Sequence, residues 1–499
     1  MTIAIHSNIS RIDKTKKTFQ SANRFSSILF TLSRLGLAAL IDKAFFRSKN
    51  SIPRKIRSTL EKLGPTFMKI GQILSLRSDI IPLEYCEELK KLLDAAPPFP
   101  FKDVRSIIEQ ELNGSIEEIF KSFDEKPLAT ASLAQVHAAV LRNGHKVAVK
   151  VQRPNLHQTV EKDLNLLRHL ASFLENHVPF TRNYRPVATV KEIYEAMIRE
   201  LDFRIEGRNA QHMRENFREN GSVRIPRIYW KYTTSKIITM EFIDGVRVDA
   251  FNELDESETD KEQLALNVTN AILKQIFIDG FFHADPHPAN IFALPDNSIC
   301  FLDFGMFGEF DQEQRKKMLL VFVSMIKGNL HDYLRYIIEF AEISEKSDLA
   351  GFKKASKELF IEMFGASIKE RSVAHAFFDG IHKGVKYNVF FPSNLVMLAK
   401  VLITFEAVAR DLDPSFNLTQ AAEPFVEELY VETMVPQELI RLFRKSSSLY
   451  IRFLHRLFKL WTNALGKLEE ESLELLLDEE EFEQEISREK SIKTGSKQA

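Results

Sequence analysis

The sequence predicts an α+β fold in which a small sheet-containing lobe precedes a helical lobe. Residues 146–151 alternate along the chain as a strand does, and residues 235–242 form a second strand-like run. Residues 311–320, in contrast, follow a helical pattern. The chain has 499 residues, which exceeds one ordinary domain but suits a two-lobed core with helical additions at both ends.

Residues 283–305 place polar side chains at the spacing of a metal–nucleotide site. Asp285 and Asn290 have the D-x-x-x-x-N spacing of a kinase catalytic loop, and Asp303 begins a D-F-G sequence. Apolar segments on either side of residues 295–297 predict a hairpin that brings Asn290 and Asp303 together. Each residue alone would fit an ordinary surface hairpin. As an ordered set, they predict that Asn290 and Asp303 bind Mg²⁺ beside ATP phosphates, while Asp285 orients a hydroxyl or water.

A lysine in an apolar strand supplies a further part of this site. Residues 147–150 match the V-A-[IV]-K pattern, in which Lys150 holds the nucleotide phosphates. A bare ammonium is costly to bury, so Lys150 is expected to pair with a carboxylate. The favoured partner is Glu200, in a helical stretch over residues 192–203, and Glu192 and Glu195 are alternatives. The strand at 235–242 would lead to an inter-lobe hinge whose backbone contacts adenine.

The sequence departs from ordinary protein kinases in three places. Residues 127–137 lack the glycines of a phosphate-binding loop, which restricts how that loop can approach phosphates. The residue before Asp285 is Ala284, so the arginine that reads an activation-loop phosphate is missing. A helix follows Gly305 almost at once, without an A-P-E sequence or a platform for a peptide. These departures favour an ATP site that does not take a conventional protein substrate.

Together these residues resemble the UbiB/ABC1 (AarF, ADCK) family of atypical kinase-like proteins. The matching motifs, over roughly residues 60–430, are Lys69-Ile70-Gly71-Gln72 (K-x-G-Q), the alanine-rich loop Ala129-Thr130-Ala131-Ser132, and Glu200-Leu201-Asp202 (E-x-D). Thr130 stands where many members have alanine. The resemblance implies a protein-kinase-like fold, with Glu200 paired to Lys150 and the K-x-G-Q helices folded over the active site. It also implies an ATPase or small-molecule kinase that supports ubiquinone or other prenyl-lipid biosynthesis.

The K-x-G-Q segment also predicts local structure. Gly64-Pro65 opens a helix that runs through Leu74, and Pro82 begins another that ends before Ala96. Lys69 and Gln72 lie one turn apart on one helix face, where they could reach a phosphate or a carboxylate. The alternative is that Lys69 is an ordinary solvated charge.

The composition of the chain argues against several kinds of partner and site. The 68 basic and 69 acidic residues give a balanced charge, so a nucleic-acid partner is not expected. Two cysteines, Cys86 and Cys300, exclude a disulfide framework and give no zinc-site spacing, which suits a reducing compartment. His283 and His287 are predicted to support the catalytic loop rather than bind a metal.

No apolar run reaches the roughly 20 residues that a membrane span needs. The nearest run, residues 388–408, is interrupted by Pro392, Lys400 and Glu406 and is predicted to be a core helix. Residues 25–46 and 439–468 have basic amphipathic patterns, which suit either an anionic membrane surface or packing on the core. Residues 1–24 have a weak transit-like character, and residues 469–489 are acidic. We expect a cytoplasmic protein with no transmembrane span, whose candidate partners are an anionic membrane surface, quinone or lipid precursors, and biosynthetic enzymes.

We predict five segments. Residues 1–55 are amphipathic or flexible, residues 56–126 form the helical K-x-G-Q extension, 127–245 the N-lobe, 246–435 the C-lobe, and 436–499 an amphipathic helix with an acidic tail. Three functions compete: an ATPase or small-molecule kinase, a protein kinase, and a pseudokinase that binds nucleotide as a structural switch. The intact Lys150, Asp285, Asn290 and Asp303 argue against the pseudokinase, and the missing peptide platform argues against the protein kinase.

Overall fold

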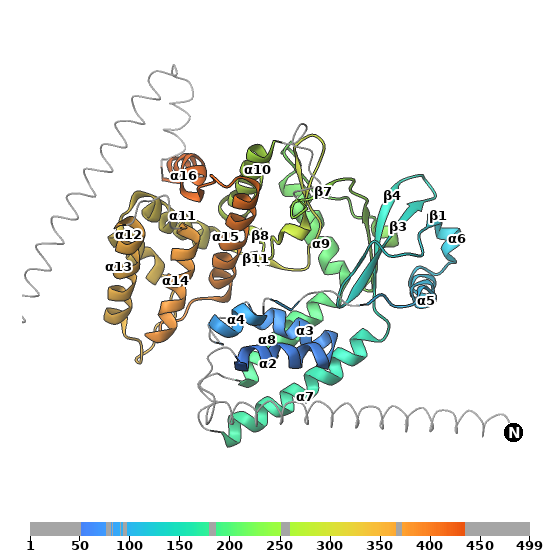
Figure 1. The fold of residues 1–499 in the computed structure, drawn as a ribbon, viewed down its shortest axis with the longest axis horizontal. Coiled ribbons are helices and arrows are strands. Elements are labelled where there is room, and N and C mark those ends of the chain that lie inside the picture. Colours follow the sequence, from blue (N-terminus) through green and yellow to red (C-terminus); the bar gives the residue numbers. More distant parts are fainter. Residues whose placement is uncertain are drawn as a thin grey trace, which may run out of the picture. The chain divides into compact units, whose positions relative to one another are not determined.

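A computed structural model describes residues 51–75, 81, 83–89, 91–92, 97–178, 186–250, 260–365 and 372–434 (Figure 1). The amphipathic segments predicted at 25–46 and 439–468, the transit-like residues 1–24 and the acidic tail lie outside this part of the chain. The chain divides into two compact units, Met1–Val426 and Glu427–Ala499. The fold below is that of the first unit, and its last helix continues into the second. The five predicted segment boundaries stay a prediction.

The N-lobe is built on a five-stranded antiparallel sheet, which confirms the predicted α+β class. Its order is β1 (Phe120–Phe123), β3 (Ala134–Leu141), β4 (Lys146–Gln152) and β6 (Ile237–Glu241), with the short β2 (Ala129–Thr130) paired to β3. Alternate residues of β4 are valines that are fully buried, as the sequence pattern predicted. The helix α5 (Phe101–Leu112) packs on the sheet through Val104 and Ile108, and the one-turn helix α6 (Ile116–Ile119) precedes β1.

The K-x-G-Q extension is helical, as predicted. It consists of α2 (Ser51–Leu63), α3 (Pro65–Ser75) and α4 (Leu83–Leu89), which lie beside α7 (Leu156–His177) and α8 (Pro186–Glu200) in Figure 1. Gly64 separates α2 from α3 with a φ of +95°, a conformation that favours glycine, and Pro65 then begins α3. Phe67 and Ile70 of α3 share one buried cluster with Ile193 and Met197 of α8.

The helix predicted over residues 192–203 is interrupted. It ends at Glu200, and a new helix, α9 (Phe203–Asn216), begins after Asp202. The Asp202 carboxylate accepts a hydrogen bond from the Arg204 backbone N–H at 3.0 Å, which caps the new helix. Because of this break, Glu206 of α9 faces the sheet, whereas Glu200 lies at the end of α8.

The predicted hairpin after the catalytic loop is confirmed. Strands β9 (Ile291–Ala293) and β10 (Ile299–Phe301) are antiparallel, and Asn297 makes the turn with a φ of +58°. The hairpin lies in a sheet of order β5 (Val223–Arg224), β10, β9 and β7 (Val246–Arg247). Beside it, β8 (Phe281–His283) pairs with β11 (Phe307–Glu309). These strands bring residues 283–285 next to residues 303–307.

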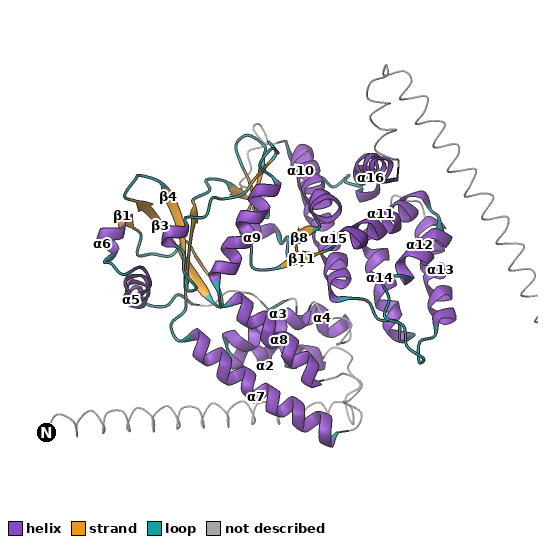
Figure 2. Ribbon diagram, turned by 180° about the vertical axis from the view of Figure 1, so that it is seen from behind, coloured by secondary structure: helices purple, strands orange, loops and turns teal. Residues whose placement is uncertain are grey.

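The C-lobe is otherwise helical (Figure 2). Its helices are α10 (Lys261–Leu273), η4 (Lys274–Asp279), η5 (Pro288–Asn290), α11 (Gln312–Lys327), α12 (Leu330–Ile338), α13 (Leu349–Gly365), α14 (Val373–Lys386), α15 (Ser393–Leu412) and α16 (Leu418–Met434). Outside the C-lobe, the short 3₁₀-helix η2 (Trp230–Tyr232) precedes β6. The helix α11 is capped by Asp311, which confirms the predicted short connection after Gly305. The predicted core helix at 388–408 is also confirmed, because α15 is largely buried. Among the described residues, no helix is long and apolar enough to cross a membrane.

Candidate active site

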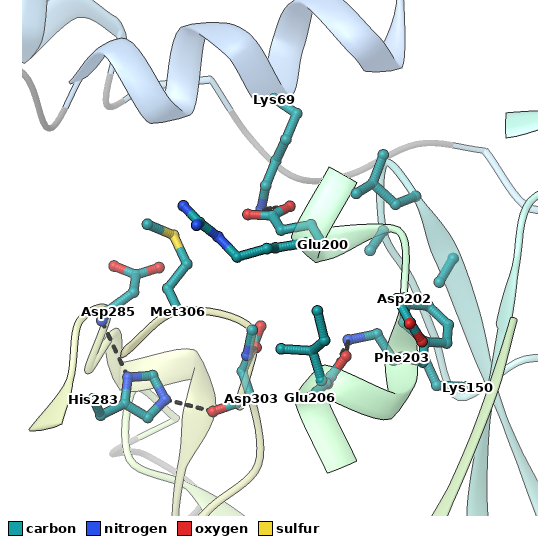
Figure 3. A pocket seen from close by; sticks show the side chains of 16 residues that line it. Lys69, Lys150, Glu200, Asp202, Phe203, Glu206, His283, Asp285, Asp303 and Met306 are labelled. Carbon is teal, nitrogen blue, oxygen red and sulfur yellow. Dashed lines mark hydrogen bonds and ion pairs between the residues drawn. The ribbon is translucent and has the colours of Figure 1, made fainter. Parts of the chain in front are cut away.

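A pocket lined by residues of both lobes gathers charged side chains (Figure 3). The charged residues that line it are Lys69, Lys150, Arg199, Glu200, Asp202, Glu206, Asp285 and Asp303. They come from α3, β4, α8, α9 and the loops around β8 and β10. The structure therefore brings the predicted lysine, catalytic-loop aspartate and D-F-G aspartate to one place.

Lys150 pairs with Glu206 of α9, so the predicted partnership with Glu200 is wrong. The Lys150 Nζ lies 2.8 and 3.0 Å from the two carboxylate oxygens of Glu206, which is only 6% exposed. Burial alone would lower the pKa of Lys150, but the charges of Glu206 and Asp303 raise it above its usual value. Lys150 is therefore a fixed cation on the pocket wall, as binding of phosphates requires.

Glu200 instead binds Lys69. The Lys69 Nζ lies 2.9 Å from Glu200 Oε2, so this ion pair joins the K-x-G-Q helix α3 to the end of α8. Lys69 reaches a carboxylate, one of the two predicted outcomes, and both side chains line the pocket. The helix break at residues 201–202 explains why Glu206 takes the place predicted for Glu200 beside Lys150. The break leaves Glu200 at the end of α8, whereas Glu206 lies on the next helix, α9.

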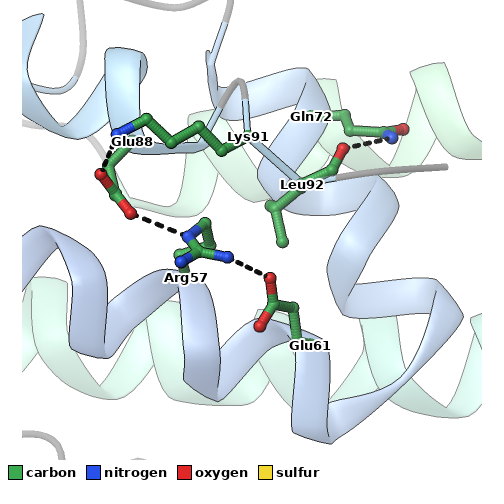
Figure 4. Close-up of polar contacts among 6 residues, drawn as sticks. All are labelled: Arg57, Glu61, Gln72, Glu88, Lys91 and Leu92. Atoms are coloured by element: carbon green, nitrogen blue, oxygen red, sulfur yellow. Dashed lines mark hydrogen bonds and ion pairs between the residues drawn. The ribbon is translucent and has the colours of Figure 1, made fainter. Parts of the chain in front are cut away.

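Gln72 does not line the pocket, although it was predicted to bind the cofactor with Lys69. Its Nε2 donates to the Leu92 carbonyl at 3.2 Å (Figure 4). Nearby, Arg57 of α2 bridges Glu61 and Glu88 at 2.6 and 2.8 Å. Gln72 thus belongs to the contacts that hold α2, α3 and α4 together.

His283 supports the catalytic loop, as predicted. Its Nδ1 accepts from the Asp285 backbone N–H at 3.1 Å, so its Nε2–H donates to the Asp303 carbonyl. Burial lowers the pKa of His283 despite both aspartates, which keeps the ring neutral. Among the described residues, no group of three or more His, Cys, Asp or Glu side chains could hold a metal ion by itself.

Asp303 and Asn290 have the donor chemistry that Mg²⁺ prefers. The Leu302 N–H donates to the Asn290 carbonyl at 3.0 Å, which sets the two predicted ligands at neighbouring positions of the hairpin. Burial alone would raise the pKa of Asp303, but Lys150 and a 2.9 Å hydrogen bond from the Gly305 N–H hold it below its usual value. An anionic carboxylate and an amide oxygen suit a hard cation whose other ligands are phosphates and water. Their role as metal ligands stays a prediction.

The alanine-rich loop reaches the pocket with only part of its length. Ala131 lines the pocket, whereas Ala129 and Thr130 form β2 and Ser132 is fully buried. The Arg153 guanidinium donates to the Ala131 carbonyl at 3.1 Å, which fixes the loop against the sheet. No residue of this loop has a positive φ, as expected of a sequence without glycine.

Sequence reasoning missed Glu206, Arg199 and Lys400. Arg199 lines the pocket from the last turn of α8. The Lys400 Nζ lies 3.0 Å from Asp285 Oδ1 and so brings a charge from α15 to the catalytic loop. A signal for Lys400 was present, because a lysine within a long apolar helix needs a polar partner.

Two family models match the chain. Residues 91–337 match the ABC1 atypical kinase-like domain, and residues 357–417 match the UbiB helical domain. A probable protein kinase UbiB of Shewanella woodyi is 33% identical, over 83% of this chain and 75% of the relative. The chain belongs to the ABC1/UbiB family of atypical kinase-like proteins.

A further relative and a solved structure are similar to this ABC1/UbiB protein. The uncharacterized protein sll1770 of Synechocystis is 34% identical over 75% of this chain, which spans 64% of that relative's length. The solved complex of Rv3197 with erythromycin, from Mycobacterium tuberculosis, matches 78% of this chain and 96% of its own, with a TM-score of 0.52 at 22% identity. The likeness to Rv3197 shows a shared fold.

Proposed function

We propose that this protein binds ATP with Mg²⁺ in the pocket and transfers the γ-phosphoryl group to a small-molecule hydroxyl or to water. The observation that carries the proposal is the grouping of the Lys150–Glu206 ion pair, Asp303 and Asp285 around one pocket. A buried lysine held by a glutamate, next to a D-F-G aspartate and a catalytic-loop aspartate, is the set of groups that kinases use.

Each group has a distinct task in this proposal. Lys150 holds nucleotide phosphates, and Asp285 orients the acceptor hydroxyl or water. Asn290 and Asp303 would hold Mg²⁺, which supplies positive charge to phosphate oxygens when it is bound. The alanine-rich loop borders the phosphate region through Ala131.

Two observations support a small acceptor over a protein substrate. The K-x-G-Q helix α3 borders the pocket and is joined to α8 by the Lys69–Glu200 ion pair. The helix α11 begins at Gln312, seven residues after Gly305, so the chain lacks the long segment on which kinases lay a peptide. The protein kinase remains the second candidate, because relatives carry the name probable protein kinase UbiB.

Ubiquinone or other prenyl-lipid biosynthesis is the proposed context. The UbiB relatives and the UbiB helical domain support it, together with the family resemblance of the motifs. The proposed candidate partners are quinone or lipid precursors, their biosynthetic enzymes and an anionic membrane surface.

Turnover of γ-³²P-labelled ATP tests the proposal. The purified protein is assayed with and without Mg²⁺, anionic vesicles and phenolic quinone precursors, and label is measured in phosphate, small molecules and protein. We expect Mg²⁺-dependent label in phosphate or a small molecule, and its loss in Asp303→Asn. Label that appears mainly in added proteins would favour the protein kinase, and nucleotide binding without turnover would favour the pseudokinase.

A further inference from the structure

We propose that Lys400 is a positioning residue for phosphoryl transfer, which reaches from the helical domain and fixes the Asp285 carboxylate of the catalytic loop. This inference rests on the proposed function. It assigns to the segment matched by the UbiB helical domain, residues 357–417, a direct part in completing the active site of the ABC1 domain, residues 91–337.

The geometry of the ion pair carries the inference. The Lys400 Nζ lies 3.0 Å from Asp285 Oδ1, and the Lys400 side chain is 18% exposed. Its neighbours along α15, Leu398, Ala399, Val401 and Leu402, are fully buried. The helix that presents Lys400 is thus held firmly by the core, while its ammonium ends at a carboxylate that lines the pocket.

Lys400 is the cation that forms an ion pair with Asp285. Lys400, His283 and Asp303 are the groups that act most strongly on this carboxylate, and Arg199 of α8 lines the same pocket. His283 directs the acceptor atom Nδ1 to the Asp285 backbone N–H, and Asp303 contributes a carboxylate to the same pocket. His287, in the catalytic loop itself, is exposed, and its ring nitrogen accepts from the Ala289 N–H. The helix α15 therefore places a positive charge in direct contact with the catalytic loop.

One partner of this ion pair is partly open to solvent. The Asp285 side chain is 42% exposed, and a pair open to solvent typically contributes about 0–1 kcal/mol to stability. The position of the pair at the pocket, rather than its contribution to folding, points to a role in the reaction.

The pair leaves one oxygen of Asp285 for the reaction. Lys400 holds Oδ1, so Oδ2 can accept the proton of the acceptor hydroxyl. As that proton passes to Asp285, the acceptor oxygen forms a bond to the γ-phosphorus. The bond between the γ-phosphorus and the β–γ bridging oxygen breaks, and ADP leaves. Lys400 acts through Asp285 by restricting its rotation, so its loss should affect the rate rather than nucleotide affinity.

The test compares Lys400→Met, Lys400→Arg and the control Lys354→Met, which removes an exposed lysine from α13. Turnover gives kcat and KM for Mg-ATP, and calorimetry gives Mg-ATP affinity. We expect Lys400→Met to lower kcat by about 100-fold, the size of effect that misplacing a catalytic group by about 1 Å can have. KM and affinity should change less than about threefold. Lys400→Arg should recover part of the rate, and Lys354→Met should match the parent.

Several results would overturn the inference. One is a kcat of Lys400→Met within about twofold of the parent value. Another is a loss of Mg-ATP affinity as large as the loss of kcat. A third is a Lys400→Arg variant that recovers none of the lost kcat. If Lys400→Met does not fold, Lys400→Gln is judged by the same criteria. A parent protein that neither binds nor turns over Mg-ATP contradicts the proposed function and removes this inference with it. A parent that does both leaves the proposed function standing, whatever Lys400 does.

Discussion

Lys69 of α3 and Lys150 of β4 line the pocket, and Lys400 of α15 contacts a residue that lines it. Each lysine pairs with a different carboxylate: Glu200, Glu206 and Asp285. The pairs assign each lysine a different task. In the proposed function, Lys150 is the cation for phosphates and Lys400 positions the catalytic loop. Lys69 joins the K-x-G-Q extension to the end of α8.

The partner of Lys150 can be tested by a double-mutant cycle. We expect Lys150→Met and Glu206→Gln each to reduce ATP turnover, and the double variant to lose less than the sum of the two logarithmic losses, because the pair acts as a unit. Glu206→Gln should also lower stability by roughly 3 kcal/mol, since it leaves a buried ammonium unpaired. Lys150→Met combined with Glu200→Gln serves as the comparison and should be nearly additive. Coupling to Glu200 rather than Glu206 would contradict the assignment.

Both cysteines are buried, and the burial of Cys300 has a chemical consequence. Burial raises the pKa of the Cys300 thiol to about 12. Below that pH the folded protein keeps this thiol protonated, so it should not react as a thiolate. We expect a disulfide reagent at pH 8 to label Cys300 only after denaturation. Rapid labelling of Cys300 in the native protein would show that β10 opens readily.

At the scale of residues, short-range spacing predicted Lys150, Asp285 and Asp303, because each lies in a compact motif on one loop or strand. The partners of these residues were harder to predict. The pairing of Glu206 with Lys150 depends on the helix break at Asp202, which the sequence analysis did not predict. Lys400 lies 115 positions from its partner Asp285 in the chain. Periodicity within a segment contains no information on such distant contacts.

Among the elements, the packing of α3 against α2 and the segment after α4 shows why the K-x-G-Q motif contains a glycine. A Cβ on Gly71 would lie 2.3 Å from Leu92 Cδ1 and 2.9 Å from Leu60 Cδ1. Gly71 therefore permits close packing of this helix against its neighbours, while Gln72 fixes the same segment through the Leu92 carbonyl.

Gly71→Ala should destabilise the protein. Overpacking costs about 1–3 kcal/mol, and the better helix propensity of alanine offsets about 1 kcal/mol of that cost. We expect a net loss of about 1 kcal/mol in denaturant unfolding. Gly221→Ala is the matched control, because a Cβ there meets no atom within 4 Å. A Gly71→Ala protein more stable than the parent would contradict the packing role.

Strands and hairpins were predicted well because their signals are local. The β9–β10 hairpin follows from two apolar runs around Asn297, and β4 follows from alternating valines. The helical stretch at 192–203 was predicted as one element because its apolar periodicity continues across the break. Asp202, a residue type that favours helix N-caps, was the signal of a new start.

For the whole molecule, the K-x-G-Q extension and the helical domain both contribute charged groups to a kinase-like core. The extension contributes Lys69, and the helical domain contributes Lys400. Their ion pairs tie the added helices to the pocket, so changes in either addition should alter the chemistry of the core.

The variant Lys69→Ala tests whether a change in the K-x-G-Q extension alters the chemistry at the pocket. It removes the ion pair that joins α3 to α8, so we expect altered ATP turnover or autophosphorylation that the parent lacks. The control Lys62→Ala removes an exposed lysine from the last turn of α2. A solvated helix charge is worth only a few tenths of a kcal/mol. Turnover and autophosphorylation identical to the parent in Lys69→Ala would leave the extension without a role at the pocket.

Calorimetric titration of ATP, with and without Mg²⁺, tests most directly whether the pocket is a nucleotide site. We expect Mg²⁺-dependent binding of about one ATP per chain, weakened about 10-fold or more by Asp303→Asn, because a charged contact is worth about 1.5–3 kcal/mol. Asp379→Asn, which changes an exposed carboxylate on α14, should bind as the parent does. Equal affinity in the parent and Asp303→Asn, or binding that does not depend on Mg²⁺, would contradict the site.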